Sequence, residues 1–132
     1  MTEALPREVA DLVARHIHSP MQLEALLALH LEPEEWWTAA RLAKQLRIAA
    51  WAVRERLEDL ASRGFLEVKT ADDVAFRYAP TSPEEAAAVS SLARIYYQRP
   101  AGVLSLIRAS RPDPVRAFAD AFRLKAEDEG DG

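Results

Sequence analysis

The sequence predicts a mainly α-helical protein with one small β-hairpin and helical extensions at both ends. Apolar residues recur at helical spacing along most of the chain, and the one pair of neighbouring segments rich in β-branched and aromatic residues follows Gly64. The 132 residues suffice for one domain of ordinary size. Because 49% of the residues are hydrophobic and 29% charged, we expect one folded core rather than a disordered chain.

The first two helices are predicted from Pro6 to His18 and from Pro20 to about His30. In the first, the apolar residues with helical spacing are Val9, Leu12, Val13 and Ile17. Ser19 is a typical cap for the second helix, Pro20 suits its first position, and Gln22 can complete a capping box. The density of leucines in the second helix indicates a largely buried element.

Residues 34–37 are predicted to form a short connector before two further helices. Thr38 can cap the third helix, whose apolar residues are Ala39, Leu42, Ala43 and Leu46. A brief turn at Arg47-Ile48 leads into the fourth helix, from Ala49 to Arg63, with Val53, Leu57 and Leu60 on its inner face. Gly64 ends this helix, since glycine adopts the left-handed conformation without a side-chain clash.

Residues 65–69 and 74–78 favour two strands of a hairpin, joined by turn residues at 70–73. Ser82 then caps a fifth helix that has Pro83 in its first position and Glu85 three residues after the cap, and that runs to about Arg99. Further helical segments are predicted at 103–109 and 115–125.

Several classes of function are excluded or disfavoured by the composition. The chain contains no cysteine, which removes disulfides, thiolate nucleophiles and cysteine-ligated metals. His16, His18 and His30 lack metal-ligand spacing, and Ser90-Ser91 and Glu84-Glu85 lack a nucleophile–base arrangement or a phosphate-binding glycine loop. We therefore expect no cofactor and no enzyme. With no signal-peptide pattern and no apolar run of membrane-spanning length, we expect a cytoplasmic protein that does not contact the membrane.

Charge is distributed unevenly along the chain. The net charge is −4, yet residues 41–63 carry six bases and three acids, whereas residues 125–132 carry one base and four acids. A basic segment of net charge +3 therefore lies in an acidic molecule. Such a segment can neutralise phosphates, which supply much of DNA affinity, although a solvated helix face is the alternative interpretation.

The order of helix, helix, turn, helix and hairpin between Pro20 and Pro80 resembles the winged helix-turn-helix superfamily, as in the MarR, ArsR and PadR groups of bacterial regulators. The resemblance is strongest at residues 38–48, then at Val53, Leu57 and Leu60, and at residues 63–66. It implies that residues 38–48 form the supporting helix, that residues 49–63 carry the recognition helix, and that Gly64-Phe65 opens the wing. The function implied is that of a sequence-specific transcriptional regulator that binds double-stranded DNA.

The resemblance also implies a set of DNA-binding residues. These are Thr38, Arg41, Lys44, Ala50, Trp51, Arg54, Arg56, Lys69 and Arg77. Ala50, Trp51 and Arg54 would lie on the outward face of the recognition helix with Glu55, and Arg54 is the best candidate for a base contact because a guanidinium can bond guanine O6 and N7 together. Arg41 and Arg56 would lie near phosphates, and Lys69 and Arg77 would reach the backbone from the flanks of the wing.

Two features depart from the family pattern. Trp51 stands where small hydroxyl or amide residues are common, and its indole can contact DNA, bind a partner protein or fold back on the core. Asp72 and Asp73 lie at the wing tip, where many members have arginine or lysine. Trp36 and Trp37 are interpreted as hairpin and core packing rather than as a stacking platform.

We predict four parts: a helical arm at 1–19, the winged helix-turn-helix domain at 20–80, dimerising C-terminal helices at 81–125, and an acidic disordered tail at 126–132. The predicted homodimer rests on apolar residues beyond what a winged core needs: Val9, Leu12, Ile17, Leu92, Ile95, Val103, Leu104 and Ile107. Two recognition helices would then meet major grooves about 34 Å apart.

The main alternative is a winged-helix protein-interaction module without strong DNA binding. Ala49, Ala50 and Trp51 would then form an apolar contact surface, and the acidic wing would repel nucleic acid. A third interpretation, compatible with the first, is a ligand-gated repressor with an apolar pocket between the winged core and the dimer helices. The sequence identifies neither a small-molecule nor a protein effector.

Overall fold

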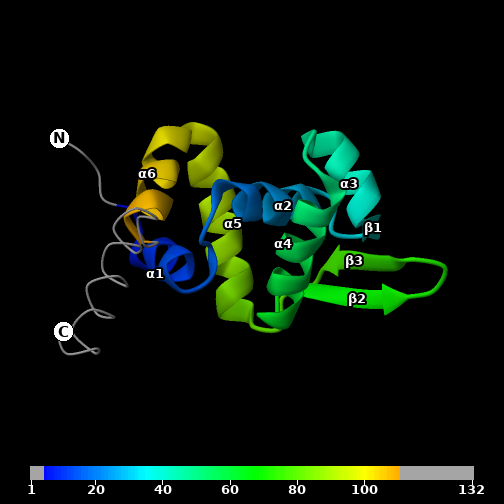
Figure 1. Cartoon of the computed structure of the whole chain (residues 1–132). Helices are drawn as coiled ribbons and strands as arrows, with labels where there is room; N and C mark the ends of the chain where they lie inside the picture. The colour runs from blue at the N-terminus through cyan, green and yellow to red at the C-terminus, as the bar shows by residue number, and fades with distance from the viewer. Residues whose placement is uncertain (1–4, 111–132) are drawn as a thin grey trace, which may run out of the picture.

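The computed structural model describes residues 5–110, so the predicted helix at 115–125 and the predicted tail at 126–132 lie outside the described residues. In chain order the elements are α1 (Arg7–His16), α2 (Pro20–Leu31), β1 (Trp37–Thr38), α3 (Ala39–Leu46), α4 (Ala50–Ser62), β2 (Leu66–Thr70), β3 (Val74–Tyr78), α5 (Pro83–Gln98) and α6 (Pro100–Ser110). Figure 1 shows the β2–β3 hairpin projecting from one side of the helices, while α1 and α6 lie on the other. The predicted mainly helical fold with a hairpin wing is confirmed.

Side-chain caps explain where three of the helices begin. The hydroxyl oxygens of Ser19, Thr38 and Ser82 accept hydrogen bonds from backbone N–H groups three residues later, at 3.1, 3.1 and 3.2 Å. All three predicted caps are confirmed. The expected capping box differs, because the Gln22 side chain accepts from the N–H of His18 (2.7 Å), one residue before the cap.

The end of α1 and the start of the sheet differ from the prediction. Ile17 has extended backbone, so α1 ends at His16 rather than His18. The sheet has a third strand that the sequence analysis missed: β1 pairs with β3, with Trp37 opposite Phe76. The predicted connector at 34–37 is therefore wrong for Trp37, since a two-residue strand is too short to show an alternating pattern.

Two residues with positive φ shape the winged region. Arg47 has φ 61° and closes α3 in the left-handed conformation, which makes the turn before α4 tight. Gly64 has φ 91°, and a Cβ at this position would lie 2.9 Å from the Thr81 hydroxyl oxygen. The predicted role of Gly64 as the end of the fourth helix is confirmed.

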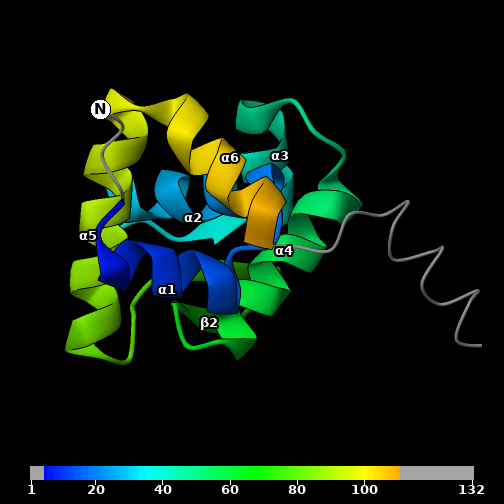
Figure 2. The same ribbon diagram turned by 90° about the vertical axis from the view of Figure 1, so that its left-hand side faces the viewer.

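One core joins the winged region to the helices α1, α5 and α6, and it covers the apolar residues on which the predicted dimer rests. In Figure 2, α1 and α6 lie in front of α2, and both pack on α5. The eight apolar residues assigned to a partner are covered by this packing: Leu104 is half-buried, and Val9, Leu12, Ile17, Leu92, Ile95, Val103 and Ile107 are buried within one chain. The interpretation of these residues as an uncovered dimer surface is therefore wrong, because α1, α5 and α6 cover one another. Dimerisation itself stays a prediction.

No helix in the described part of the chain is long and apolar enough to cross a membrane.

Candidate nucleic-acid interface

The outward face of α4 is solvent-exposed at every position expected from helical spacing. Ala50, Trp51, Arg54 and Glu55 are all exposed, and the Trp51 side chain is exposed to 69%. The opposite face, with Val53 and Leu57, is fully buried against the core. The indole of Trp51 therefore does not fold back on the core, which removes one of its three interpretations.

The N-terminus of α4 has no side-chain cap. Ala49 occupies the cap position and cannot accept a hydrogen bond through its side chain, and the first turn contains no acidic residue. The first N–H groups of a helix lack partners within the helix and carry the positive end of its dipole. This end of α4 can therefore bind an anion such as a phosphate.

The arginines of α4 are paired with carboxylates of the same helix. Arg54 Nε lies 3.2 Å from Glu58 Oε2, and Arg56 Nη1 lies 3.4 Å from Glu55 Oε1. Both side chains of the Arg54–Glu58 pair are more than half exposed. Exposed pairs of this kind contribute only about 0–1 kcal/mol, so Arg54 can leave Glu58 for another acceptor at little cost.

The rings of Trp36 and Trp37 make cation–π contacts with three of the expected DNA-binding side chains. The ring of Trp36 lies 4.4 Å from both Lys69 Nζ and Arg77 Cζ, and Arg77 Nη2 is 2.7 Å from Glu67 Oε1. Stacking on an aromatic face fixes a cation without neutralising it. We call Arg41, Lys69 and Arg77, with the two tryptophans, the wing-root cluster.

Arg41 joins this cluster from α3. Its Cζ lies 3.9 Å from the ring centroid of Trp37, and its Nη1 bonds both Glu35 Oε1 (3.2 Å) and the carbonyl oxygen of Trp36 (3.0 Å). The prediction of core packing is confirmed for Trp37, which is 1% exposed. The prediction of hairpin packing is confirmed for Trp36, whose ring packs on Lys69 of β2 and Arg77 of β3. Neighbouring side chains of an extended segment point to opposite faces, so Trp37 lies in the core while Trp36 meets the hairpin side chains.

The other predicted residues occupy separate places. The Thr38 hydroxyl caps α3, while Lys44 is exposed on the same helix and has no ion-pair partner among residues 5–110. Arg56 lines a groove of about 250 Å³ with His18, Ser19, Gln22 and Asp59 rather than joining Arg54. At the wing tip, Asp72 and Asp73 are exposed, and Asp73 Oδ1 accepts from the N–H of Val74 (2.7 Å). One of the unexpected acids thus stabilises the hairpin turn.

A groove of about 310 Å³ separates α3 and α4 from the wing. Its apolar lining consists of Ala39, Ala40, Ala50, Trp51, Val74 and Phe76, and its polar residues are Arg54 and Asp73. The expected recognition residues Ala50, Trp51 and Arg54 therefore share one concave surface with the hairpin turn and strand β3 of the wing.

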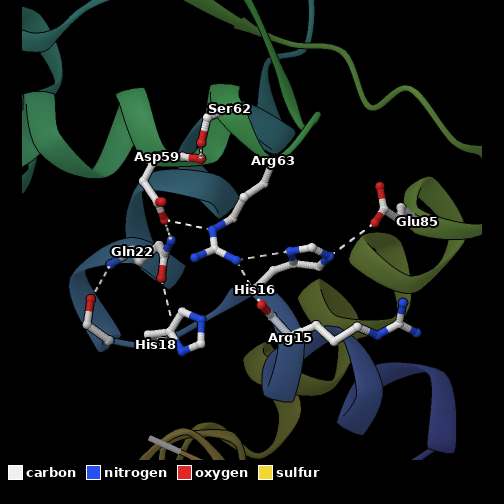
Figure 3. A network of polar contacts seen from close by, with 9 residues as sticks. Arg15, His16, His18, Gln22, Asp59, Ser62, Arg63 and Glu85 are labelled. Carbon is white, nitrogen blue, oxygen red and sulfur yellow. Dashed lines mark hydrogen bonds and ion pairs between the residues drawn. The ribbon is translucent and has the colours of Figure 1, made fainter.

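A second polar region, missed by the sequence analysis, joins α1, α2 and α5 to the end of α4 (Figure 3). Arg63 Nε donates to Asp59 Oδ2 (2.9 Å), and Arg63 Nη1 donates to the carbonyl oxygen of Arg15 (2.8 Å). The Gln22 side chain, 2% exposed, donates to the same Asp59 oxygen (2.5 Å). We call this set, with His16 and Glu85, the Arg63 network.

His16 links the Arg63 network to α5. Its Nδ1 lies 3.4 Å from Arg63 Nη1, and its Nε2 lies 3.2 Å from Glu85 Oε2. Because the guanidinium can only donate, Nδ1 accepts and Nε2 carries the proton in the neutral ring. Burial lowers the pKa of His16; Glu85 opposes this shift, and Arg63 and Arg15 add to it.

A second histidine also contacts α5. His30 Nε2 lies 3.4 Å from Ser90 Oγ, and the ring meets Tyr78 edge-on with centroids 5.1 Å apart. Burial lowers the pKa of His30 and raises the pKa of Tyr78 to about 12.

A further cleft lies between α1 and α5. It measures about 330 Å³, and most of the side chains around it are charged: Glu8, Asp11, Arg15, Glu84 and Glu85. Within residues 5–110, no three His, Asp or Glu side chains are grouped so that they can hold a metal ion.

Comparison with known proteins establishes the fold. No protein-family model matches the sequence, and no curated protein shows significant sequence similarity to it. The structure is similar to the crystal structure of wild type MarR (apo form) from E. coli, with a TM-score of 0.50 and 14% identity over 91% of this chain and 86% of that chain. The chain therefore has the MarR-like winged helix fold, and the resemblance stated from the sequence is confirmed at the level of the fold.

Proposed function

We propose that this chain is a sequence-specific transcriptional regulator that places α4 in the major groove of double-stranded DNA. The observation that carries the proposal is the exposed face of α4, with Ala50, Trp51 and Arg54 beside the wing, on a winged helix fold. In such folds the N-terminal residues of the second helix of the helix-turn-helix contact base edges.

The proposal divides the expected residues by task. Arg54 contacts a base, because it can exchange its exposed pair with Glu58 for guanine O6 and N7. The wing-root cluster and Lys44 contact phosphates, and the uncapped N-terminus of α4 adds backbone donors. Thr38 and Arg56 complete the proposed interface from its edges.

The homodimer is part of the proposal and rests on the fold alone, since the apolar residues first assigned to a partner are covered within the chain. Two copies would bind half-sites about one helical turn apart, which makes the operator pseudo-palindromic. Sedimentation of a dimer at micromolar concentration supports this geometry, whereas a monomer on and off DNA contradicts it.

The test is fluorescence anisotropy of the protein with duplexes selected from a randomised pool, across a salt series. Wild type is compared with Arg54→Ala and with the control Arg108→Ala, which removes an exposed arginine from α6, on the side of the molecule away from the wing. We expect affinity to fall steeply with salt, because binding releases counterions. Arg54→Ala should cost about 1–3 kcal/mol and relax sequence preference at one position, and Arg108→Ala should change little. No binding at low salt contradicts the proposal.

A protein-interaction module is the second candidate, favoured by a specific observation. Arg41, Arg54, Arg56 and Arg77 are all paired with glutamates, while Trp51 is exposed beside an apolar groove. The salt series separates the two candidates, since an apolar protein interface does not weaken as salt rises.

A further inference from the structure

We propose that Trp51 sets the sequence preference of this regulator by covering the C5-methyl group of thymine in the major groove. This inference rests on the proposed function and adds the base feature that is recognised. Trp51 is the second residue of α4, and its side chain is 69% exposed. The residue thus lies where recognition helices contact base edges.

The chemistry of the first turn of α4 limits what it can recognise. Ala49 and Ala50 carry no hydrogen-bonding side-chain group, and the indole of Trp51 has one N–H donor and no acceptor. The major groove displays donors, acceptors and the thymine methyl. An apolar ring between alanines complements the methyl, which only thymine carries, whereas the polar edges that the ring leaves without a partner occur on A·T and G·C pairs alike.

The groove beside Trp51 provides further apolar surface for a methyl group. Ala39, Ala40 and Val74 continue the apolar surface away from the ring, so that a methyl group placed there has apolar neighbours on more than one side. The polar side chains of the groove are Arg54, which is engaged with Glu58, and Asp73, which bonds the backbone of the hairpin turn. Arg54, three residues after Trp51, is therefore the one hydrogen-bond donor among the other side chains that line the groove.

The magnitude follows from the burial of one methyl group. Burial of one CH₂ or CH₃ group contributes ~0.8 kcal/mol, and ~1.4 kcal/mol corresponds to a tenfold change in affinity. One methyl group therefore changes affinity about fourfold. Two half-sites would multiply the effect to about fifteenfold for a symmetric replacement.

The experiment replaces thymine with deoxyuridine, which removes only the methyl group and keeps base pairing. Each thymine of a selected duplex is replaced in turn, and binding of the full chain is measured for wild type, Trp51→Ala and Arg54→Ala. We expect the replacement to weaken wild-type binding about fourfold per half-site at one or two positions. It should have no effect at those positions in Trp51→Ala, and Arg54→Ala should keep the wild-type sensitivity. Trp51→Phe, which retains an apolar ring, should keep part of it.

The outcomes separate the inference from the proposed function. Salt-sensitive binding without any deoxyuridine effect, or with an equal effect in Trp51→Ala, overturns the inference and leaves the regulator standing. Failure to bind any duplex at low salt overturns both. Because the Trp51 side chain is largely exposed, Trp51→Ala should melt within a few degrees of wild type, so that a loss of methyl sensitivity is not a folding defect.

Discussion

Two arginine–carboxylate pairs on α4 have the same spacing but different surroundings. Arg54–Glu58 is an exposed pair at 3.2 Å, with side chains 51% and 57% exposed. In the Arg63–Asp59 pair, at 2.9 Å, the arginine is 28% exposed. Gln22 also bonds Asp59, and Arg63 also contacts the carbonyl oxygen of Arg15 and the ring of His16. The comparison shows that a four-residue spacing alone does not assign a role to an arginine–carboxylate pair. Arg54 can leave Glu58 for an acceptor outside the chain, whereas the contacts around Arg63 connect four helices.

The largest predicted effect separates the stabilities of these two pairs. Arg63→Met removes hydrogen bonds to Asp59 and to the Arg15 carbonyl, and we expect it to lower the free energy of unfolding by about 2 kcal/mol. Arg54→Met should change it by less than about 0.5 kcal/mol. Chemical denaturation of both variants tests this difference, and equal losses would show that the Arg63 network adds nothing beyond an exposed pair.

A second prediction concerns pH and the two histidines that contact α5. The pKa of His16 and of His30 lies below 6.5 in the folded state, so the unfolded chain takes up protons first as pH falls. Their contribution to stability is fully present above pH 6.5 and is lost as pH falls through the folded pKa. We expect the melting temperature to decrease from pH 7.5 to pH 5.

The histidine variants identify the source of this pH dependence. His16→Gln and His30→Gln, which cannot take up a proton, should each flatten the decrease, and the double variant should flatten it further. His18→Gln is the matched control, because it makes the same substitution at a neighbouring histidine. An unchanged pH profile in the double variant would locate the effect elsewhere.

The smallest predicted effect concerns the exposed pair and DNA. Glu58→Gln removes a negative charge beside Arg54, and we expect it to strengthen DNA binding about threefold with little change in stability. Asp11→Asn, on α1, makes the same change in net charge away from the wing and serves as the control. Anisotropy that rises equally in both variants would indicate net charge rather than release of Arg54.

The predicted recognition face could be located from the sequence because it depends on local spacing. Val53, Leu57 and Leu60 define the buried side of α4, and Ala50, Trp51 and Arg54 must then face outward. The contacts of other predicted residues, such as Lys69 and Arg77, did not follow from spacing. Trp36 was not expected to stack on Lys69 and Arg77, since these residues meet only when β3 aligns β1 with β2.

The sequence by itself determined the local events of this fold: the caps at Ser19, Thr38 and Ser82, the end of α4 at Gly64, and the apolar side of each described helix. Each depends on hydrogen bonds or backbone preferences within about one helical turn. The tertiary structure alone decided that α1, α5 and α6 cover one another, and that Gln22 meets Asp59 and His16 meets Arg63. These contacts join residues dozens of positions apart, and no periodic pattern records which buried faces will meet.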